Sequence, residues 1–254
     1  MSDKNNGMSL VGHLTELRKR LVWVAAIFMI AMIGGFFLAI PFLDYLKNAP
    51  PAVGHEWNAF APWDGLRVYM QFAFLFAIVI SLPVILYQVW AFVKPGLRKT
   101  EQSVTLRYIP MAMLLLLMGL SFAYFVVFRM AFYFTVQINS SLGLTETYGI
   151  AQYFSFMFNI LLPVTLLFEL PIVVMFLTRL RILTPERLKK ARRYAYMTLV
   201  VISTLVTPPD AISAIIVAIP LILLFELSII LSKGIYKKQQ ARDLAREETY
   251  DSEY

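Results

Sequence analysis

The chain of 254 residues contains no cysteine and has few charged residues. The absence of cysteine excludes a disulfide framework and any thiol chemistry. Charged residues make up 15% of the chain, well below the roughly 25% of a typical soluble domain, whereas hydrophobic residues make up 59%. A composition so poor in charge and so rich in apolar residues is typical of a membrane protein.

The sequence also lacks the short motifs of common enzyme classes. It has no G-x-x-x-x-G-K-[ST] loop, so we do not expect the chain itself to hydrolyse ATP. It has no G-x-S-x-G or G-x-G-D motif, and its two histidines, His13 and His55, lie outside the apolar blocks. No cluster of cysteine, histidine or carboxylate residues predicts a metal site. We therefore expect no enzyme activity, no cofactor and no bound metal.

Six blocks of apolar sequence predict transmembrane helices, since about 20 helical residues cross a bilayer. The fifth block has only 13 residues, which span ~20 Å of a hydrocarbon core of ~30 Å. We therefore expect an all-α membrane protein with six transmembrane helices, of which the fifth and sixth are short or shallow. The blocks are 21–43, 67–92, 108–128, 153–178, 194–206 and 211–231.

Lysine and arginine are distributed unevenly between these blocks. The first 20 residues and segments 93–107, 179–193 and 232–254 together carry 20 of them, and the remaining segments carry 3. The positive-inside rule then predicts that both termini are cytoplasmic. The net charge of +7 indicates contact with membrane lipids and not with nucleic acid.

The domain organisation expected from this pattern is simple. Residues 1–232 form a single transmembrane domain, and residues 233–254 form a charged cytoplasmic tail. The polar composition of this tail predicts a partly disordered segment or a frayed helix.

Two acidic residues, Glu16 and Glu101, stand out in the basic segments. Each has a local explanation: Glu16 can pair with Lys19 or Arg20, and Glu101 with Arg98, in contacts worth a few tenths of a kcal/mol. Alternatively, the two carboxylates hold a cationic ligand. A guanidinium group suits them best, because it can bond a carboxylate through two parallel hydrogen bonds.

The run LLFEL occurs twice, and each copy places a glutamate inside an apolar block. Glu169 comes ten residues before Arg179, which is ~15 Å of helix and close to the middle of a bilayer. Glu226 comes seven residues before Lys233 and is therefore ~10 Å from the interface. A charged residue at the bilayer centre costs at least ~2.5 kcal/mol and usually marks a function.

The two glutamates are therefore expected to differ. Pro163 and Pro171 flank Glu169 and predict a bend that presents its carboxyl group to a sheltered concavity. Because burial disfavours the charged form, we expect Glu169 to be protonated and to donate a hydrogen bond to a partner helix. A buried structural hydrogen bond is the alternative for Glu169. Glu226 is expected to be structural, with water or Lys233 as its partner.

The short fifth block ends in polar residues, Ser203, Thr204 and Thr207, followed by a turn that ends at Asp210. Hydroxyl groups at this depth can bond a second helix within the membrane. They can instead bond carbonyl groups of their own helix. The first reading predicts a docking surface for a single-span partner protein.

Several segments resemble the TatC family, the multispanning subunit of the twin-arginine protein translocase, and they occur in order along all six blocks. Asp64 and Leu66 depart from the Glu and Phe that are usual in the family, and Ala214 stands where Gln is frequent. The similar segments are HLTELRKRL (13–21), LPVILYQVWAFVKPGLRKTE (82–101), FAYFVVF (122–128), FELP (168–171), LTPERLKKARRY (183–194) and LVTPPDAIS (205–213).

The resemblance implies a receptor in the bacterial cytoplasmic membrane that binds twin-arginine signal peptides of folded precursors. It also implies assembly with single-span TatA-type partners, with TatB-type partners and with other copies of the chain, for export driven by the proton motive force. The alternative is a secondary transporter or channel that uses Glu169 as a proton-coupling site. The implied signal-peptide site is Glu16, Leu17, Arg18, Phe92, Leu97 and Glu101, and the implied assembly residues are Glu169, Thr204, Thr207 and Asp210.

Overall fold

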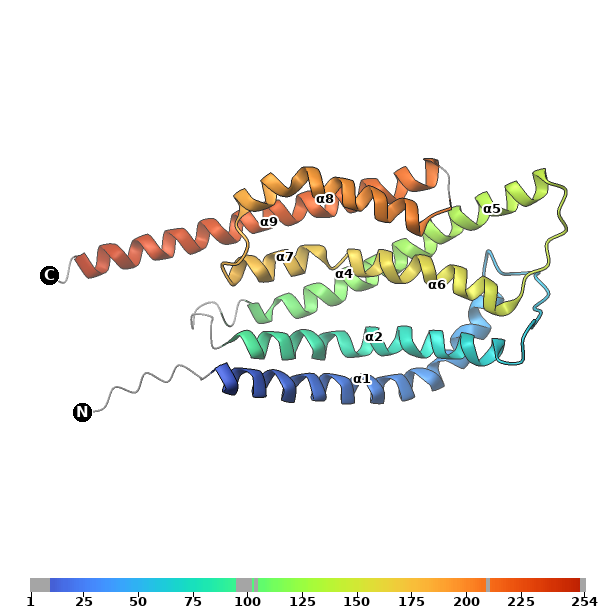
Figure 1. Ribbon diagram of the computed structural model, residues 1–254, viewed down its shortest axis with the longest axis horizontal. Helices are drawn as coiled ribbons and strands as arrows, with labels where there is room; N and C mark the ends of the chain where they lie inside the picture. The colour runs from blue at the N-terminus through green and yellow to red at the C-terminus, as the bar shows by residue number, and fades with distance from the viewer. Residues whose placement is uncertain (1–9, 95–101, 103–104, 209–210, 252–254) are drawn as a thin grey trace.

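The computed structural model describes residues 10–94, 102, 105–208 and 211–251, and these residues are helical, with turns and loops but no strand (Figure 1). The elements are α1 (Leu10–Lys47), α2 (Asp64–Val93), α4 (Tyr108–Phe122), the π-helix η2 (Ala123–Phe128), α5 (Arg129–Ser141), α6 (Ile150–Leu167), α7 (Leu170–Arg179), α8 (Pro185–Val206) and α9 (Ala211–Asp251).

Within the described residues, five helical segments are long and apolar enough to cross a membrane, which confirms the prediction of an all-α membrane protein. The fifth predicted block, 194–206, is the second half of α8, whose first half is rich in lysine and arginine. α8 is not among the five candidate spans, so six spans and cytoplasmic termini remain predictions. The five are Leu14–Lys47, Asp64–Val93, Tyr108–Ser141, Ile150–Arg179 and Ala211–Ala245.

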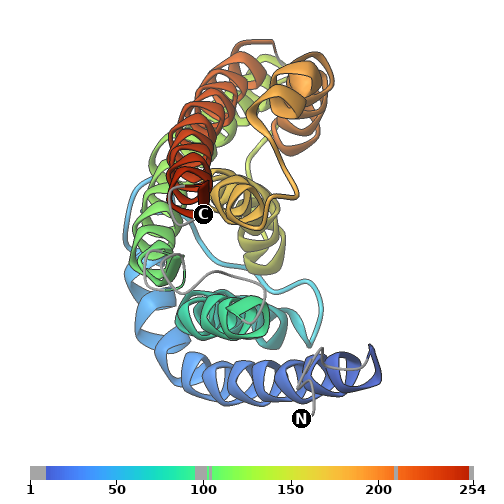
Figure 2. The same ribbon diagram turned by 90° about the vertical axis from the view of Figure 1, so that its left-hand side faces the viewer.

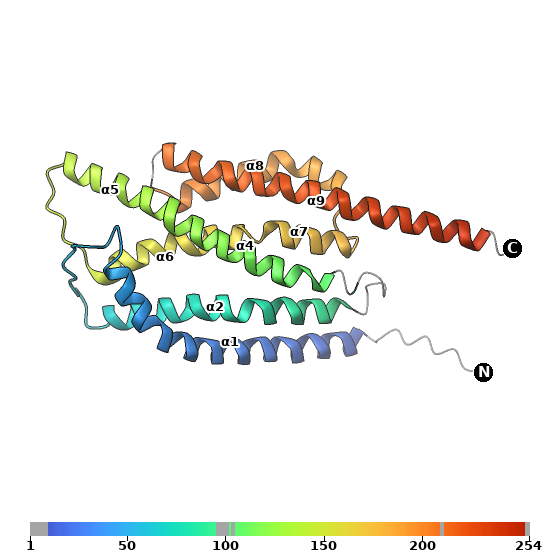
Figure 3. The same cartoon turned by 180° about the vertical axis from the view of Figure 1, so that it is seen from behind.

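The long helices run roughly side by side and form an arc when seen end on (Figures 1 and 2). α1 packs on α2 at one end of the arc, and α8 packs on α9 at the other. From behind, α4, η2 and α5 form one long inclined rod (Figure 3). The core between α2 and α6 is aromatic: the ring of Phe72 lies 5.4 Å from that of Phe154 and 4.9 Å from that of Phe158. These edge-to-face contacts fix the spacing of the two helices.

The predicted fourth block, 153–178, is interrupted in the region where a bend was expected. α6 and α7 are separated by two residues in a turn, Phe168 and Glu169. Pro171 explains the break, since it has no N–H group for the carbonyl four residues earlier and disfavours helical geometry in the residue before it. Pro163 lies inside α6, which continues past it. Glu169 therefore sits at the interruption itself.

α9 continues through the predicted domain boundary at 232–233 and ends at Asp251. Gln239 donates a hydrogen bond to the carbonyl oxygen of Arg179 at 3.1 Å, and Arg181 pairs with Asp243 at 2.8 Å. The first part of the tail is thus a helical continuation that holds the end of α7. The expectation of a disordered or frayed tail is wrong for this part, because its side chains have partners on the transmembrane domain.

Asp64, one of the departures from the family pattern, has a structural role at the start of α2. Its carboxylate is buried and accepts hydrogen bonds from the backbone N–H groups of Phe60, at 2.8 Å, and Ala61, at 2.9 Å. These bonds shape the loop that leads into α2. An acidic residue at this position is therefore explained by the fold.

Two adjacent glycines of α1 give a matched test of its packing on α2. A Cβ atom on Gly35 would lie 2.7 Å from the carbonyl oxygen of Ala73, whereas one on Gly34 would meet no atom within 4 Å. We expect Gly35→Ala to lower the free energy of unfolding by about 1–3 kcal/mol, because α1 must move away from α2. Gly34→Ala should be neutral or stabilising by up to about 1 kcal/mol. Thermal unfolding of both variants in detergent measures the difference, and equal stabilities would contradict it.

Candidate functional site: two intramembrane glutamates and a carboxylate at the basic end

Glu16 lies near the start of α1 and is held by Arg20, one turn later. Nη2 of Arg20 lies 2.5 Å from Oε1 of Glu16, and Nε lies 3.1 Å from the same oxygen. The same guanidinium donates to Oε1 of Gln88 at 3.1 Å and to the carbonyl oxygen of Ala91 at 3.2 Å, both on α2. The local pairing of Glu16 is therefore present. It also anchors Glu16 beside the last turns of α2.

The other described residues of the predicted signal-peptide site lie at this end of the molecule. Leu17 and Arg18 follow Glu16 on α1 and are exposed, and Phe92 is half-buried in the last turn of α2. Leu97 and Glu101 lie outside the described residues. The structure thus brings Glu16 close to the end of α2 that carries Phe92, and it leaves Glu101 as a prediction.

Two hydrogen bonds bring together the ends of the segment that contains Leu97 and Glu101. Gln102 donates from Nε2 to the carbonyl oxygen of Lys94 at 3.1 Å, and Nε1 of Trp90 donates to the carbonyl oxygen of Gln102 at 3.0 Å. Lys94 and Gln102 are therefore held close together, beside the end of α2. An apolar hollow of 350 Å³ lies there between α2, α4 and α7, with Trp90 and Tyr108 in its wall.

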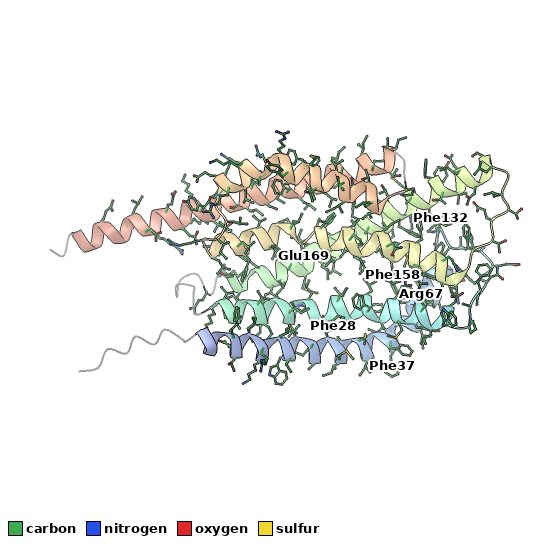
Figure 4. All side chains as sticks on the ribbon, in the orientation of Figure 1. Phe28, Phe37, Arg67, Phe132, Phe158 and Glu169 are labelled. Carbon is green, nitrogen blue, oxygen red and sulfur yellow. The ribbon has the colours of Figure 1, made fainter. Side chains whose placement is uncertain are left out.

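Glu169 lies at the junction of α6 and α7, about midway along the bundle (Figure 4). It is 8% exposed, and its Oε1 atom is buried without a hydrogen-bond partner among the described residues. A buried polar atom of this kind costs about 1–3 kcal/mol when it is left unpaired. The internal hydrogen bond that would make Glu169 purely structural is therefore missing at this oxygen.

Glu226 differs from Glu169 because it is paired. Its Oε2 atom lies 2.5 Å from Nη2 of Arg192, and its Oε1 atom accepts a hydrogen bond from the hydroxyl group of Tyr196. Both partners come from α8. The prediction that Lys233 pairs with Glu226 is therefore wrong. The structural role expected of Glu226 is supported: it ties α8 to α9. Sequence reasoning missed Arg192 and Tyr196, whose only signal is their spacing of four residues on one helix face.

The hydroxyl groups at the end of α8 bond their own helix. Ser203 donates to Val200 at 2.7 Å, Thr204 to Val201 at 2.8 Å, and Thr207 to Ser203 at 2.8 Å, each to a carbonyl oxygen. Ser203 and Thr207 are buried within the chain, whereas Thr204 is exposed. Asp210 lies outside the described residues. Among the predicted docking residues that the structure describes, Thr204 alone lies at the surface, where its neighbours Met197, Val201 and Leu205 are also exposed.

Metal chemistry finds no support in the described residues, which contain no group of three or more histidine and carboxylate side chains able to hold an ion. The polar groups described above can instead bind a guanidinium group, at Glu16, or exchange a hydrogen bond with a neighbouring helix, at Glu169. Both are functions of recognition.

Comparison with known proteins gives consistent results. The family model of the Sec-independent protein translocase protein TatC matches residues 12–220. The chain is 48% identical to TatC of Halalkalibacterium halodurans over 246 residues, which is 97% of each chain. It is 48% identical to TatCy of Bacillus subtilis over 242 residues, which is 95% of each chain.

A solved structure shares the fold. It is the crystal structure of the twin-arginine translocase receptor TatC in DDM, with a TM-score of 0.76 and 31% identity. The match covers 87% of this chain and 99% of the other. The alternative of a secondary transporter for small solutes does not hold, because these relatives are parts of a protein translocase. This chain therefore belongs to the TatC family, whose members are membrane components of a Sec-independent protein translocase and not enzymes.

Proposed function

We propose that this chain is the receptor subunit of a twin-arginine translocase in the bacterial cytoplasmic membrane, with both termini in the cytoplasm. It binds the twin-arginine signal peptide of a folded precursor and nucleates the assembly of single-span TatA-type partners, and of TatB-type partners where the cell has them. Export is driven by the proton motive force. The observation that carries the proposal is the guanidinium-binding arrangement of Glu16, on α1, at the basic end of the molecule.

The contacts of Arg20 support this proposal. Glu16 already holds one guanidinium group, and the amide of Gln88 and the carbonyl of Ala91 supply further acceptors beside it. A signal-peptide arginine finds the same three kinds of acceptor and competes with Arg20 for them. Arg–carboxylate pairs gain both energy and geometric specificity from parallel hydrogen bonds. Glu101 is the second carboxylate of the proposed site and binds the second arginine.

Apolar side chains complete the proposed site. Leu17 and Phe92 contact the hydrophobic part of the signal peptide, together with Leu97. The hollow beside Trp90 offers further apolar surface at the same end of the molecule. Arg18 is exposed. We assign it to the orientation of Glu16 or to contact with a lipid phosphate.

Photocrosslinking tests this proposal directly. With Glu16 and Glu101 left in place, a photoreactive amino acid at position 17 or 92 should capture a synthetic twin-arginine signal peptide and should capture a twin-lysine version of it much less. Lysine retains the charge but lacks the planar fork that matches a carboxylate. Position 33 is the control, because Ile33 is exposed on α1 but lies more than four helical turns from Glu16. Equal capture of both peptides at position 17 would overturn the proposal.

The small size of this chain is the reason to expect that it recruits partner proteins. A folded domain of 100 residues has a radius of gyration of ~13 Å, and helices are ~10–12 Å across, so a chain of this size cannot enclose such a domain.

We propose that Glu169 and the exposed face of α8 around Thr204 contact single-span partner helices. Other copies of the chain and membrane lipids complete the assembly. The unpaired oxygen of Glu169 supports the first contact, and the exposure of Thr204 supports the second.

The docking face of α8 gives a separate prediction. A tryptophan in place of Thr204 should reduce crosslinking of α8 to a TatA-type or TatB-type partner several-fold, because its bulk separates the two helices. Ile33→Trp is the matched control, since Ile33 is also exposed but lies at the other end of the arc, on α1. Site-specific crosslinking in membranes measures the effect. If Thr204→Trp leaves the crosslinks unchanged, the docking surface lies elsewhere.

A further inference from the structure

Arg129 is a cation of the third span that the proposed function does not use. The helix of this span begins at Tyr108, and Arg129 follows 21 residues later, which is ~32 Å of helix. A hydrocarbon core is ~30 Å thick. Since the apolar block 108–128 ends just before it, we place Arg129 at the level of the lipid headgroups, within the long helical segment Tyr108–Ser141 and on the side opposite the basic loops 93–107 and 179–193.

The side chain of Arg129 lies back along its own helix. Its Cζ atom is 5.1 Å from the ring centre of Phe125 and 5.8 Å from that of Tyr124, residues that are one turn nearer the membrane centre. Long cationic side chains near the end of a span usually extend the other way, towards water. In the part of the chain that the structure describes, Arg129 forms no salt bridge with a carboxylate. The site therefore holds a positive charge at headgroup depth whose counter-ion the described residues do not supply.

Arg129 also lies between two hollows. One has a volume of 300 Å³ and is lined by residues of α1, α2, α4, η2, α5 and α6 and of the loop after α1; its wall is mainly apolar but includes the phenol groups of Tyr45 and Tyr124. The other has a volume of 350 Å³, lies between α5 and the start of α9, and carries polar groups from Tyr133 and Gln137. Their walls meet at Arg129. The apolar part of the first wall includes Phe42, Leu46, Phe72, Leu120 and Phe125.

We propose that this region binds an anionic phospholipid of the leaflet opposite the basic loops. The Arg129 guanidinium holds the phosphate group, an acyl chain fills the apolar hollow beside Phe42 and Phe125, and the rest of the headgroup lies towards Tyr133 and Gln137. The apolar hollow, the guanidinium group and the polar hollow thus occur in the same order as the acyl chain, the phosphate and the rest of the headgroup in such a lipid. Charge complementarity favours an anionic lipid. A zwitterionic headgroup carries a cation of its own, and the described residues that line the two hollows include no carboxylate to pair with it.

A lipid fits this site better than a partner helix does. A helix is ~10–12 Å across, whereas the first hollow is a cavity of 300 Å³ lined by residues of six helical elements. Tyrosine is also the residue type that accompanies lipid headgroups at membrane interfaces. The bound lipid would join α1 and η2 at this end of the molecule, so its binding should stabilise the folded chain.

The test uses the full-length chain purified in a mild detergent and then supplied with phosphatidylglycerol or phosphatidylcholine. Native mass spectrometry measures retained lipid, and thermal unfolding measures stabilisation. We expect phosphatidylglycerol to be retained and to raise the unfolding temperature more than phosphatidylcholine does. Arg129→Gln should weaken phosphatidylglycerol binding about 10-fold, since a hydrogen bond to a charged group is lost. Arg67→Gln is the control: Arg67 is exposed near the start of α2 (Figure 4) and lines neither hollow.

Equal retention of phosphatidylglycerol by Arg129→Gln and the unaltered chain would overturn the proposal, and so would an equal loss in Arg67→Gln. A second measurement covers the case in which Arg129→Gln does not fold. A photoreactive amino acid at Phe125, which is exposed and lines the first hollow, should capture phosphatidylglycerol in preference to phosphatidylcholine in the otherwise unaltered chain. Capture of both lipids equally, or of a protein in place of lipid, would contradict the site.

Discussion

The double substitution Glu16→Ala, Glu101→Ala is expected to reduce the affinity for a twin-arginine signal peptide by about 10²-fold or more. Hydrogen bonds to charged groups contribute about 1.5–3 kcal/mol each, and 1.4 kcal/mol is a factor of ten. Loss of Glu16 also removes the carboxylate that pairs with Arg20 at 2.5 Å. An unpaired cation then remains where two further cations must bind. Binding of a fluorescent signal peptide to the purified chain measures the change.

The matched control for this experiment is Glu186→Ala. Glu186 is an exposed acid in the first turn of α8, on the predicted cytoplasmic side, where a negative charge stabilises the start of a helix. Its removal should leave peptide affinity unchanged. Glu101→Asp should weaken binding less than Glu101→Lys, because it preserves the charge. Unchanged binding by the double variant would show that the arginines are recognised by other groups.

The sequence predicted the class of fold because burial in lipid requires long apolar runs, and these are visible in composition alone. It did not predict the helix ends. The first apolar block was expected at 21–43, whereas α1 extends from Leu10 to Lys47. Hydropathy marks the part of a helix that lies in lipid, and the polar residues around Glu16 continue the same helix outside it. The break at Glu169 was predictable, because proline acts locally on the backbone.

Contacts between distant residues could not be predicted in this way. The partners of Glu226 lie 34 and 30 residues away, on α8, and no local pattern links them to it. Sequence reasoning therefore chose the nearest cation, Lys233, and missed the pair that the fold provides. The hydroxyl groups of Thr204 and Thr207 show the same limit. Both bond carbonyl groups of their own helix, but Thr207 is buried and Thr204 is exposed, a difference that the local sequence does not reveal. The contacts of Arg20 with Glu16 and with the end of α2 likewise depend on how α1 packs against α2.

Glu169→Ala is expected to impair partner recruitment and export severely while leaving signal-peptide binding intact, and Glu169→Gln is expected to retain much of both. Glu169 sits at the break between α6 and α7, with Oε1 buried and unpaired among the described residues. A glutamine keeps the shape and the hydrogen-bonding capacity of a neutral carboxyl group. An alanine removes the group that a polar residue on a partner helix would meet within the membrane. Export assays and crosslinking to a TatA-type partner measure the two effects.

The paired glutamate provides the control for this prediction. Glu226→Ala removes the partner of Arg192 and of Tyr196 and leaves an arginine without its counter-ion between α8 and α9. It should lower the thermal stability of the chain, since loss of one member of a partly buried pair leaves the other uncompensated, whereas Glu169→Ala should not. If Glu169→Gln is as inactive as Glu169→Ala, an ionisable group is required at this position and proton transfer replaces docking as its role. If Glu226→Ala instead abolishes recruitment without loss of stability, the roles of the two LLFEL copies are reversed.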